Sequence, residues 1–179
     1  MIPLGTAFLG VNMRLAAVFL FLGLLAARPC EATVSADFSA QILAAHNAER
    51  TALKLPPLAW SETLAAHAAV WAKHLAETGQ PQHSPASERV GEGENLWVGS
   101  AGGFTPAEMA GAWAQEKQFF QYGAFTSGIM PGGHVVGHYS QMIWKNTSQI
   151  GCAVARTSSW DILVCRYSPR GNLVGEKPY

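Results

Sequence analysis

The stretch that decides the fold is Gly137-His138-Tyr139-Ser140-Gln141-Met142-Ile143-Trp144, which places a histidine among aromatic and apolar neighbours. Three further polar side chains have similarly apolar neighbours along the chain, namely His83, Glu94 and Glu116. Imidazoles and carboxylates in apolar surroundings are costly unless they meet one another or a cation. We therefore expect these four side chains to converge on one cleft, either as a binding site or as a structural tie.

Length and charge narrow the class of protein. The chain has 179 residues, which predicts one domain with a leader. Twelve basic and twelve acidic residues give a formal net charge of zero, and the sequence contains no basic run. We therefore expect no nucleic-acid partner.

The N-terminal residues 1–32 have the pattern of a secretory signal peptide. Arg14 is the only charged residue among the first 27, and an apolar run follows it. Small residues provide possible cleavage sites for the signal peptide after Ala32, or as late as Ala36. The alternative is an uncleaved anchor, since the apolar segment is long enough to span a bilayer. We favour cleavage, which predicts a secreted, extracellular or periplasmic protein with no stable membrane insertion.

Cleavage would also remove Cys30 and leave one pair of cysteines, Cys152 and Cys165. In an oxidising compartment this pair is expected to form a disulfide. Its spacing suits two antiparallel strands joined by a turn. The alternative is two buried free thiols.

Periodicity and capping signals predict helices first and strands last, which is typical of an α+β domain. A capping box opens one helix at Thr105, whose buried stripe should carry Trp113 and Glu116. The region 80–103 is predicted to be an irregular loop with a short strand at 95–98. The remaining expected elements are helices over 40–53, 61–77 and 138–144, a loop over 119–133, and strands over 150–157 and 160–167.

Four motifs in order resemble the CAP superfamily, whose domain is also called SCP. This superfamily groups cysteine-rich secretory proteins, antigen 5 and plant pathogenesis-related class-one proteins. The opening octapeptide matches its first signature, and the second runs from Leu163 to Leu173. The shorter motifs are His46-Asn47-x-x-Arg50 and Gly93-Glu94-Asn95-Leu96. The resemblance covers about residues 39–175, within an expected CAP/SCP domain over 37–179.

This resemblance implies a three-layer α-β-α sandwich with a central antiparallel sheet. It implies a cleft lined by His83, Glu94, Glu116 and His138, and a disulfide that corresponds to Cys152–Cys165. The chain lacks the cysteine-rich extension of venom and reproductive relatives, so ion-channel blocking is not implied. We interpret the motif residues His46, Asn47 and Arg50 as structural.

Several functions remain open for this cleft. We favour binding of a small ligand, with His83 and His138 as ligands of zinc or another divalent cation, in a defence or host-interaction setting. Glu94 and Glu116 would orient the two imidazoles. His134 is interpreted as a loop residue. A metal-dependent, protease-like hydrolase with either glutamate as the base is the alternative, although we favour a protein that is not an enzyme.

Two further interpretations concern the surroundings of the cleft. By analogy with sterol- and fatty-acid-binding relatives, an apolar ligand would lie in an aromatic groove. The four polar residues could instead form a purely structural network. The aromatic residues considered for the groove are Trp97, Phe104, Phe119, Phe120, Tyr122 and Phe125.

Overall fold

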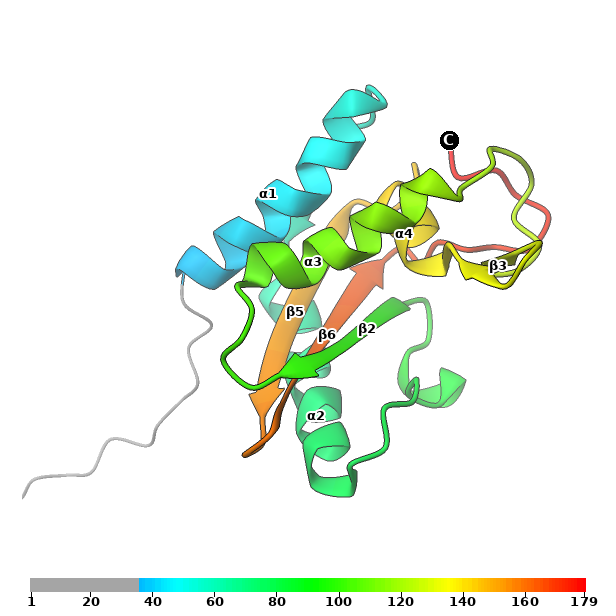
Figure 1. Ribbon diagram of the computed structural model, residues 1–179. Helices are drawn as coiled ribbons and strands as arrows, with labels where there is room; N and C mark the ends of the chain where they lie inside the picture. The colour runs from blue at the N-terminus through cyan, green and yellow to red at the C-terminus, as the bar shows by residue number, and fades with distance from the viewer. Residues whose placement is uncertain (1–35) are drawn as a thin grey trace, which may run out of the picture. The chain divides into compact units, whose positions relative to one another are not determined.

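The computed structural model describes residues 36–179, so the predicted signal peptide at 1–32 lies outside the described residues. The domain contains helices and strands in the order shown in Figure 1. The α-helices are α1 (Ala36–Ala52), α2 (Glu62–Thr78), α3 (Pro106–Ala114) and α4 (Gly137–Met142), and the 3-10 turns are η1 (Ala86–Glu88) and η2 (Gln115–Gln118). The strands are β1 (Ala59–Trp60), β2 (Gly93–Ser100), β3 (Ile129–Met130), β4 (His134–Val135), β5 (Gln149–Arg156) and β6 (Trp160–Ser168).

The main sheet has the strand order β1-β5-β6-β2. The three long strands β5, β6 and β2 pair antiparallel, as the resemblance implied. The two-residue strand β1 pairs parallel with β5, so the sheet is mixed. This correction has a simple cause: two residues are too few to give a strand periodicity.

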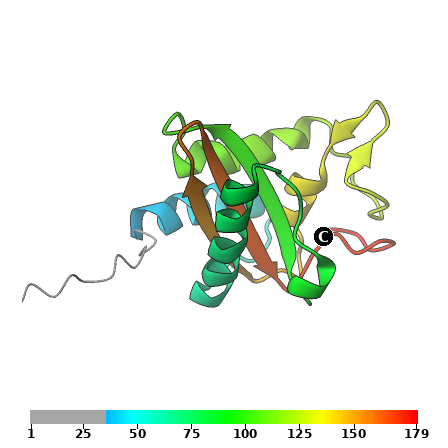
Figure 2. The same cartoon turned by 90° about the horizontal axis from the view of Figure 1, so that it is seen from below.

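Helices cover both faces of the sheet, which confirms the three-layer α-β-α sandwich. Figure 2 shows α2 in front of the strands, with α1 and α3 behind them. The sheet has a hydrophobic core on each face. Alternate residues of β6 pack into one core or the other, because successive side chains of a strand point to opposite faces. Leu163 and Tyr167 pack in the core with α1, α3 and α4, whereas Ile162 and Val164 pack against α2.

The helix α2 follows its sequence signals closely. The Ser61 hydroxyl accepts a hydrogen bond from the Leu64 amide, and Gly79 ends the helix in the left-handed region at φ 68°. The helix lies very close to β5, since a Cβ on Gly151 would be 2.2 Å from the Ala65 nitrogen. Only glycine permits this separation of helix and strand.

The disulfide joins Cys152 and Cys165, which lie directly opposite each other on β5 and β6. Both cysteines are fully buried, and they are thirteen residues apart in sequence. Closing a loop of this size typically contributes about 3 kcal/mol to stability.

The predicted boundaries of helices, strands and loops differ most from the observed ones where pairing between distant segments decides the structure. One third of the expected loop 80–103 is the eight-residue edge strand β2, because the segment 93–100 pairs along its whole length with β6. The α-helix that starts at the Thr105 capping box ends at Ala114. Glu116 therefore lies in the 3-10 turn η2 and not in the predicted helix. His134 lies in β4, which forms a short hairpin with β3 instead of the expected loop.

Candidate ligand cleft

The four polar residues expected to converge form two imidazole–carboxylate pairs. His83 in the loop after α2 lies with Nδ1 2.7 Å from Oε1 of Glu94 on β2. His138 on α4 lies with Nδ1 2.6 Å from Oε1 of Glu116 on η2. Each histidine therefore meets one carboxylate, supplied by a different part of the fold.

One cavity of about 400 Å3 contacts three of the four residues: His83, Glu94 and His138. Glu116 does not line this cavity. The cavity opens beside the edge strand β2, and Phe125, Ile129 and Val135 give it an apolar wall. The two pairs therefore share one hollow, with three members at its surface.

Glu94 is held in place by several donors. Its side chain is buried, and Oε1 accepts hydrogen bonds from the Ser84 amide at 3.0 Å and from His83. The Ser84 hydroxyl donates to Oε2 at 2.8 Å. Burial alone would raise the pKa of Glu94, but the hydrogen bonds from His83 and Ser84, with the Arg166 charge, hold that pKa below its usual value.

Arg166 is the cation that neutralises this buried carboxylate. Its Nε lies 3.0 Å from Glu94 Oε2 without hydrogen-bond geometry, so the contact is ionic. Its terminal nitrogens donate to Glu92 at 3.1 Å and to the Ser84 hydroxyl at 3.0 Å. We did not predict this role, although the register provides a signal: Arg166 lies opposite Glu94 in the β2–β6 pair.

Glu116 binds two backbone amides of α4 in addition to the His138 ring. Its Oε2 accepts hydrogen bonds from the amides of His138 and Tyr139, both at 3.0 Å. These amides belong to the first turn of α4, where no partner within the helix exists for them. Glu116 therefore caps the helix that carries His138 and also fixes the direction of the imidazole.

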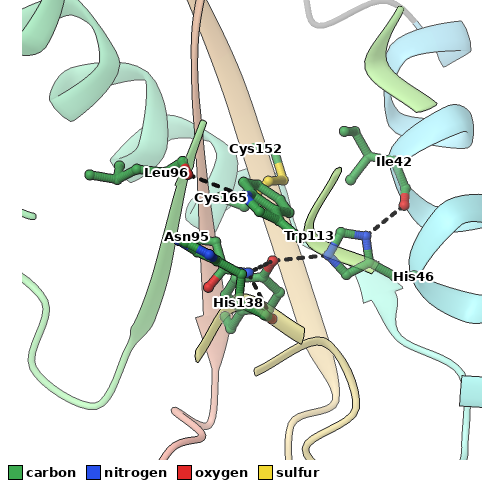
Figure 3. The surroundings of a disulfide bond; sticks show 9 residues. Ile42, His46, Asn95, Leu96, Trp113, His138, Cys152 and Cys165 are labelled. Atoms are coloured by element: carbon green, nitrogen blue, oxygen red, sulfur yellow. Dashed lines mark hydrogen bonds between the residues drawn. A yellow bond between two sulfur atoms is a disulfide. The ribbon is translucent and has the colours of Figure 1, made fainter. Parts of the chain in front are cut away.

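The His138 ring also stacks on Trp113, with 5.9 Å between ring centroids. Figure 3 shows His138, Trp113 and His46 beside the disulfide. The Trp113 indole donates to the Leu96 carbonyl at 3.1 Å, which fixes the ring against β2. Asn95 donates to the His138 carbonyl at 3.2 Å. The position of His138 is therefore determined by two buried residues, Trp113 and Asn95.

Both imidazoles use Nδ1 for their carboxylates, which leaves Nε2 of each ring available. Among residues 36–179 no side chain or carbonyl forms a hydrogen bond with either Nε2 atom. A ring that donates its Nδ1 proton to a carboxylate carries a lone pair on Nε2, the usual arrangement of a metal-binding histidine. Within the same residues, no group of three or more His, Cys, Asp or Glu side chains is arranged to hold a metal ion.

The two serines next to the histidines show no nucleophile geometry. The Ser84 hydroxyl is used by Glu94 and Arg166. The Ser140 hydroxyl is buried and bonds Asn172 at 2.7 Å. Neither hydroxyl forms a hydrogen bond with an imidazole of the described residues, so a serine–histidine pair is not formed.

The aromatic residues expected to form one groove are instead distributed over the domain. Only Phe125 lines the cavity. Trp97 packs on Phe104 with centroids 5.0 Å apart, and Phe119 stacks on His134 at 3.8 Å. Phe120 contacts Tyr139, and Tyr122 contacts Tyr179. The apolar wall of the cavity comes mainly from the β3–β4 hairpin, which we did not predict.

The comparison with protein families agrees with this fold and its motifs. The model described as the cysteine-rich secretory protein family, CAP, matches residues 43–167. The chain belongs to the CAP family. Within residues 36–179, no helix of this CAP domain is long and apolar enough to cross a bilayer.

Plant members of the CAP family are similar over most of the chain. The pathogenesis-related protein PR-1 of Medicago truncatula is 35% identical over 147 residues, covering 81% of each chain. The pathogenesis-related protein PRMS of Zea mays is 34% identical over 169 residues, covering 93% of this chain and 97% of the relative. A crystal structure of NaASP2 with Zn2+ superimposes with a TM-score of 0.71 at 27% identity, covering 81% of this chain and 86% of that one.

Proposed function

We propose that this CAP protein binds a divalent cation, zinc in the first place, through Nε2 of His83 and His138. The observation that carries the proposal is that two imidazoles, each oriented by a carboxylate, line one cavity with Nε2 uncommitted. The crystal structure of NaASP2 with Zn2+ supports the choice of metal. Two histidine ligands leave positions for water or a ligand from solution, as in open zinc sites.

We infer that the protein acts outside the cytoplasm in a defence-related role. Its similar plant relatives are named pathogenesis-related proteins. A disulfide between two buried cysteines fits an oxidising compartment, as does the signal-peptide pattern at 1–32.

Zinc titration of the purified protein by calorimetry tests the metal proposal. We expect one binding event, and His83→Ala or His138→Ala should each weaken zinc affinity at least about tenfold, since each removes a ligand. Glu116→Gln should weaken it about tenfold, because partners that orient a ligand typically contribute 10- to 100-fold. His74→Ala is the matched control, because His74 stacks on Trp71 away from the cavity. Identical heats for wild type and both cleft variants would contradict the proposal and leave the structural network as the explanation.

A second candidate ligand is a sterol or fatty acid held against the apolar wall of the cavity. Ile129 and Val135 on the β3–β4 hairpin are 58% and 46% exposed, and both line the cavity with Phe125. Exposed aliphatic side chains at a concave site favour an apolar ligand. We expect Ile129→Ser to reduce uptake of fluorescent sterol or fatty acid about threefold, with Val70→Ser, an exposed valine on α2, as control. No uptake by the wild type would refute this candidate.

A further inference from the structure

A second, larger cavity of about 650 Å3 lies next to the candidate cleft. It shares His83, Glu94 and Asn172 with the cleft. Its walls come from two segments, around Arg89 and around Arg170, which are joined by the hydrogen bond from the Arg170 amide to the Gly91 carbonyl at 3.0 Å. Neither arginine takes part in the proposed metal site, so the ligand of this cavity is a separate question.

Two acidic residues of this cavity already have partners within the protein. Glu92 lies 2.8 Å from His67 Nδ1 and 3.1 Å from a terminal nitrogen of Arg166. Glu94 is paired with His83 and with Arg166, as described above. Arg166 offsets one of these two negative charges, and both carboxylates already have partners within the protein.

The two arginines of the cavity remain largely unused. The Arg89 Nε donates to the Ser84 carbonyl at 3.0 Å, while its terminal nitrogens have no partner among the described residues. The Arg170 side chain is exposed, and within residues 36–179 it has no hydrogen bond or ion pair. Glu176 is the cavity's remaining carboxylate, and no described side chain pairs with it. Two guanidinium groups without an ion-pair partner and one such carboxylate thus line the same cavity.

The two amide side chains that line the cavity, Gln141 and Asn172, form hydrogen bonds within the protein. Gln141 donates to the Thr147 hydroxyl and accepts from the Gly171 amide. Asn172 donates to the Gly137 carbonyl and accepts from the Ser140 hydroxyl. The guanidinium groups are consequently the free donors of this wall, and their planar forks match acceptors with two oxygens.

We propose that this cavity is a binding site for a small anion, a carboxylate or phosphate group, held by Arg89 and Arg170. The site lies beside the candidate metal cleft, so one ligand with an acidic group could reach both. The proposal does not depend on metal binding, because neither arginine lines the smaller cavity.

The test is an NMR titration of the purified protein with inorganic phosphate, at constant ionic strength and with divalent metals removed. We expect saturable shifts of the amides around Gly91 and Gly171. Arg170→Gln should weaken phosphate binding about fivefold, the upper range for one exposed ion pair. Its side chain has no hydrogen bond or ion pair to lose among the described residues, so folding should be unaffected. Glu176→Gln should strengthen binding about twofold, because it removes the opposing charge.

Controls separate this site from general electrostatics and from the metal site. Lys73→Gln removes an exposed cation on α2 that does not line the cavity, so it should leave phosphate affinity unchanged. Acetate should compete at the same amides if a carboxylate is accepted. Zinc titration of Arg170→Gln should match wild type, whatever the outcome for His83→Ala. Equal losses in Lys73→Gln and Arg170→Gln, or no saturable shifts, would overturn the proposal. Binding to vesicles containing phosphatidic acid without a response to inorganic phosphate would also overturn it.

Discussion

Replacing Arg50 with methionine should lower the free energy of unfolding by about 5 kcal/mol, because it strands several buried carbonyls at once. Arg50 is fully buried in α1. Its Nε donates at 2.6 Å to the Pro56 carbonyl, and Nη1 donates at 3.1 and 2.8 Å to the carbonyls of Met142 and Trp144. Nη2 donates at 2.9 Å to the Thr147 carbonyl. Burial lowers the pKa of Arg50 to about 10, so the group stays charged at neutral pH.

Arg50→Lys should still cost about 3 kcal/mol, because one ammonium group cannot reach acceptors arranged around a planar fork. Arg170→Lys is the matched control, since that side chain has no partner in the described part of the chain, and its effect should stay within about 0.5 kcal/mol. Urea unfolding followed by circular dichroism measures each change. An Arg50→Lys protein as stable as Arg170→Lys would show that the carbonyl cluster is satisfied in another way.

The position of Arg50 explains why a short motif in α1 accompanies the signature of α4. Three of the four carbonyls named above lie at the C-terminal end of α4 and in the segment after it, and the fourth, of Pro56, follows α1, whereas His138 lies near the start of α4. Asn47, one turn earlier, makes two hydrogen bonds with the Leu58 backbone, at 3.1 and 2.8 Å. Together these side chains fix both chain segments that leave α1 and α4. Both side chains therefore bond backbone groups of these segments and contact no carboxylate among the described residues.

The elements that could be predicted are those whose signals are local. The Ser61 cap, the buried stripe of α2 and the Thr105 capping box each depend on residues within a few positions, and each is present. The last two strands are an antiparallel pair because their alternation and the turn between them are continuous in sequence. The CAP motifs supplied the arrangement of layers that local signals lack.

The features that could not be predicted depend on pairing between distant segments. The strand β2 contains two glycines and a single β-branched residue, so its propensity is weak and its partner β6 determines its length. Glu116 was expected on a buried helical stripe, but the helix tightens into a 3-10 turn after Ala114, which presents the carboxylate to α4. Arg166 was not singled out, because only the β2–β6 register shows that it neutralises Glu94.

The remaining large effect concerns His46, which makes stability depend on pH. Its ring is fully buried, with Nδ1 2.8 Å from the Ile42 carbonyl and Nε2 2.9 Å from the Tyr167 hydroxyl. The carbonyl can only accept, so Nδ1 carries the proton and Nε2 accepts from Tyr167, whose oxygen accepts in turn from Asn95. Burial chiefly, with the charge of Arg50, lowers the pKa of His46 from 6.5 to about 4.

Protonation of His46 therefore favours the unfolded state, where its pKa is higher. Its contribution to stability is complete above pH 6.5 and is lost as the pH falls toward 4. At about 1.4 kcal/mol for each pH unit, this loss reaches about 2 kcal/mol at pH 5 and about 3 kcal/mol at pH 4. Urea unfolding between pH 7.5 and 5 measures it in a range where Glu94, with its lowered pKa, stays ionised.

The variant His46→Gln should be less stable than wild type at pH 7.5 but should lack this component of the pH slope, so the two stability curves should converge toward pH 5. Subtracting the curves removes the titrations that both proteins share. His74→Gln, which replaces a histidine stacked on Trp71 outside the polar network, should run parallel to wild type. Parallel stability curves for wild type and His46→Gln would mean that His46 carries the same charge in the folded and unfolded states. The hydrogen-bond chain from Ile42 through a neutral His46 to Asn95 would then be wrong.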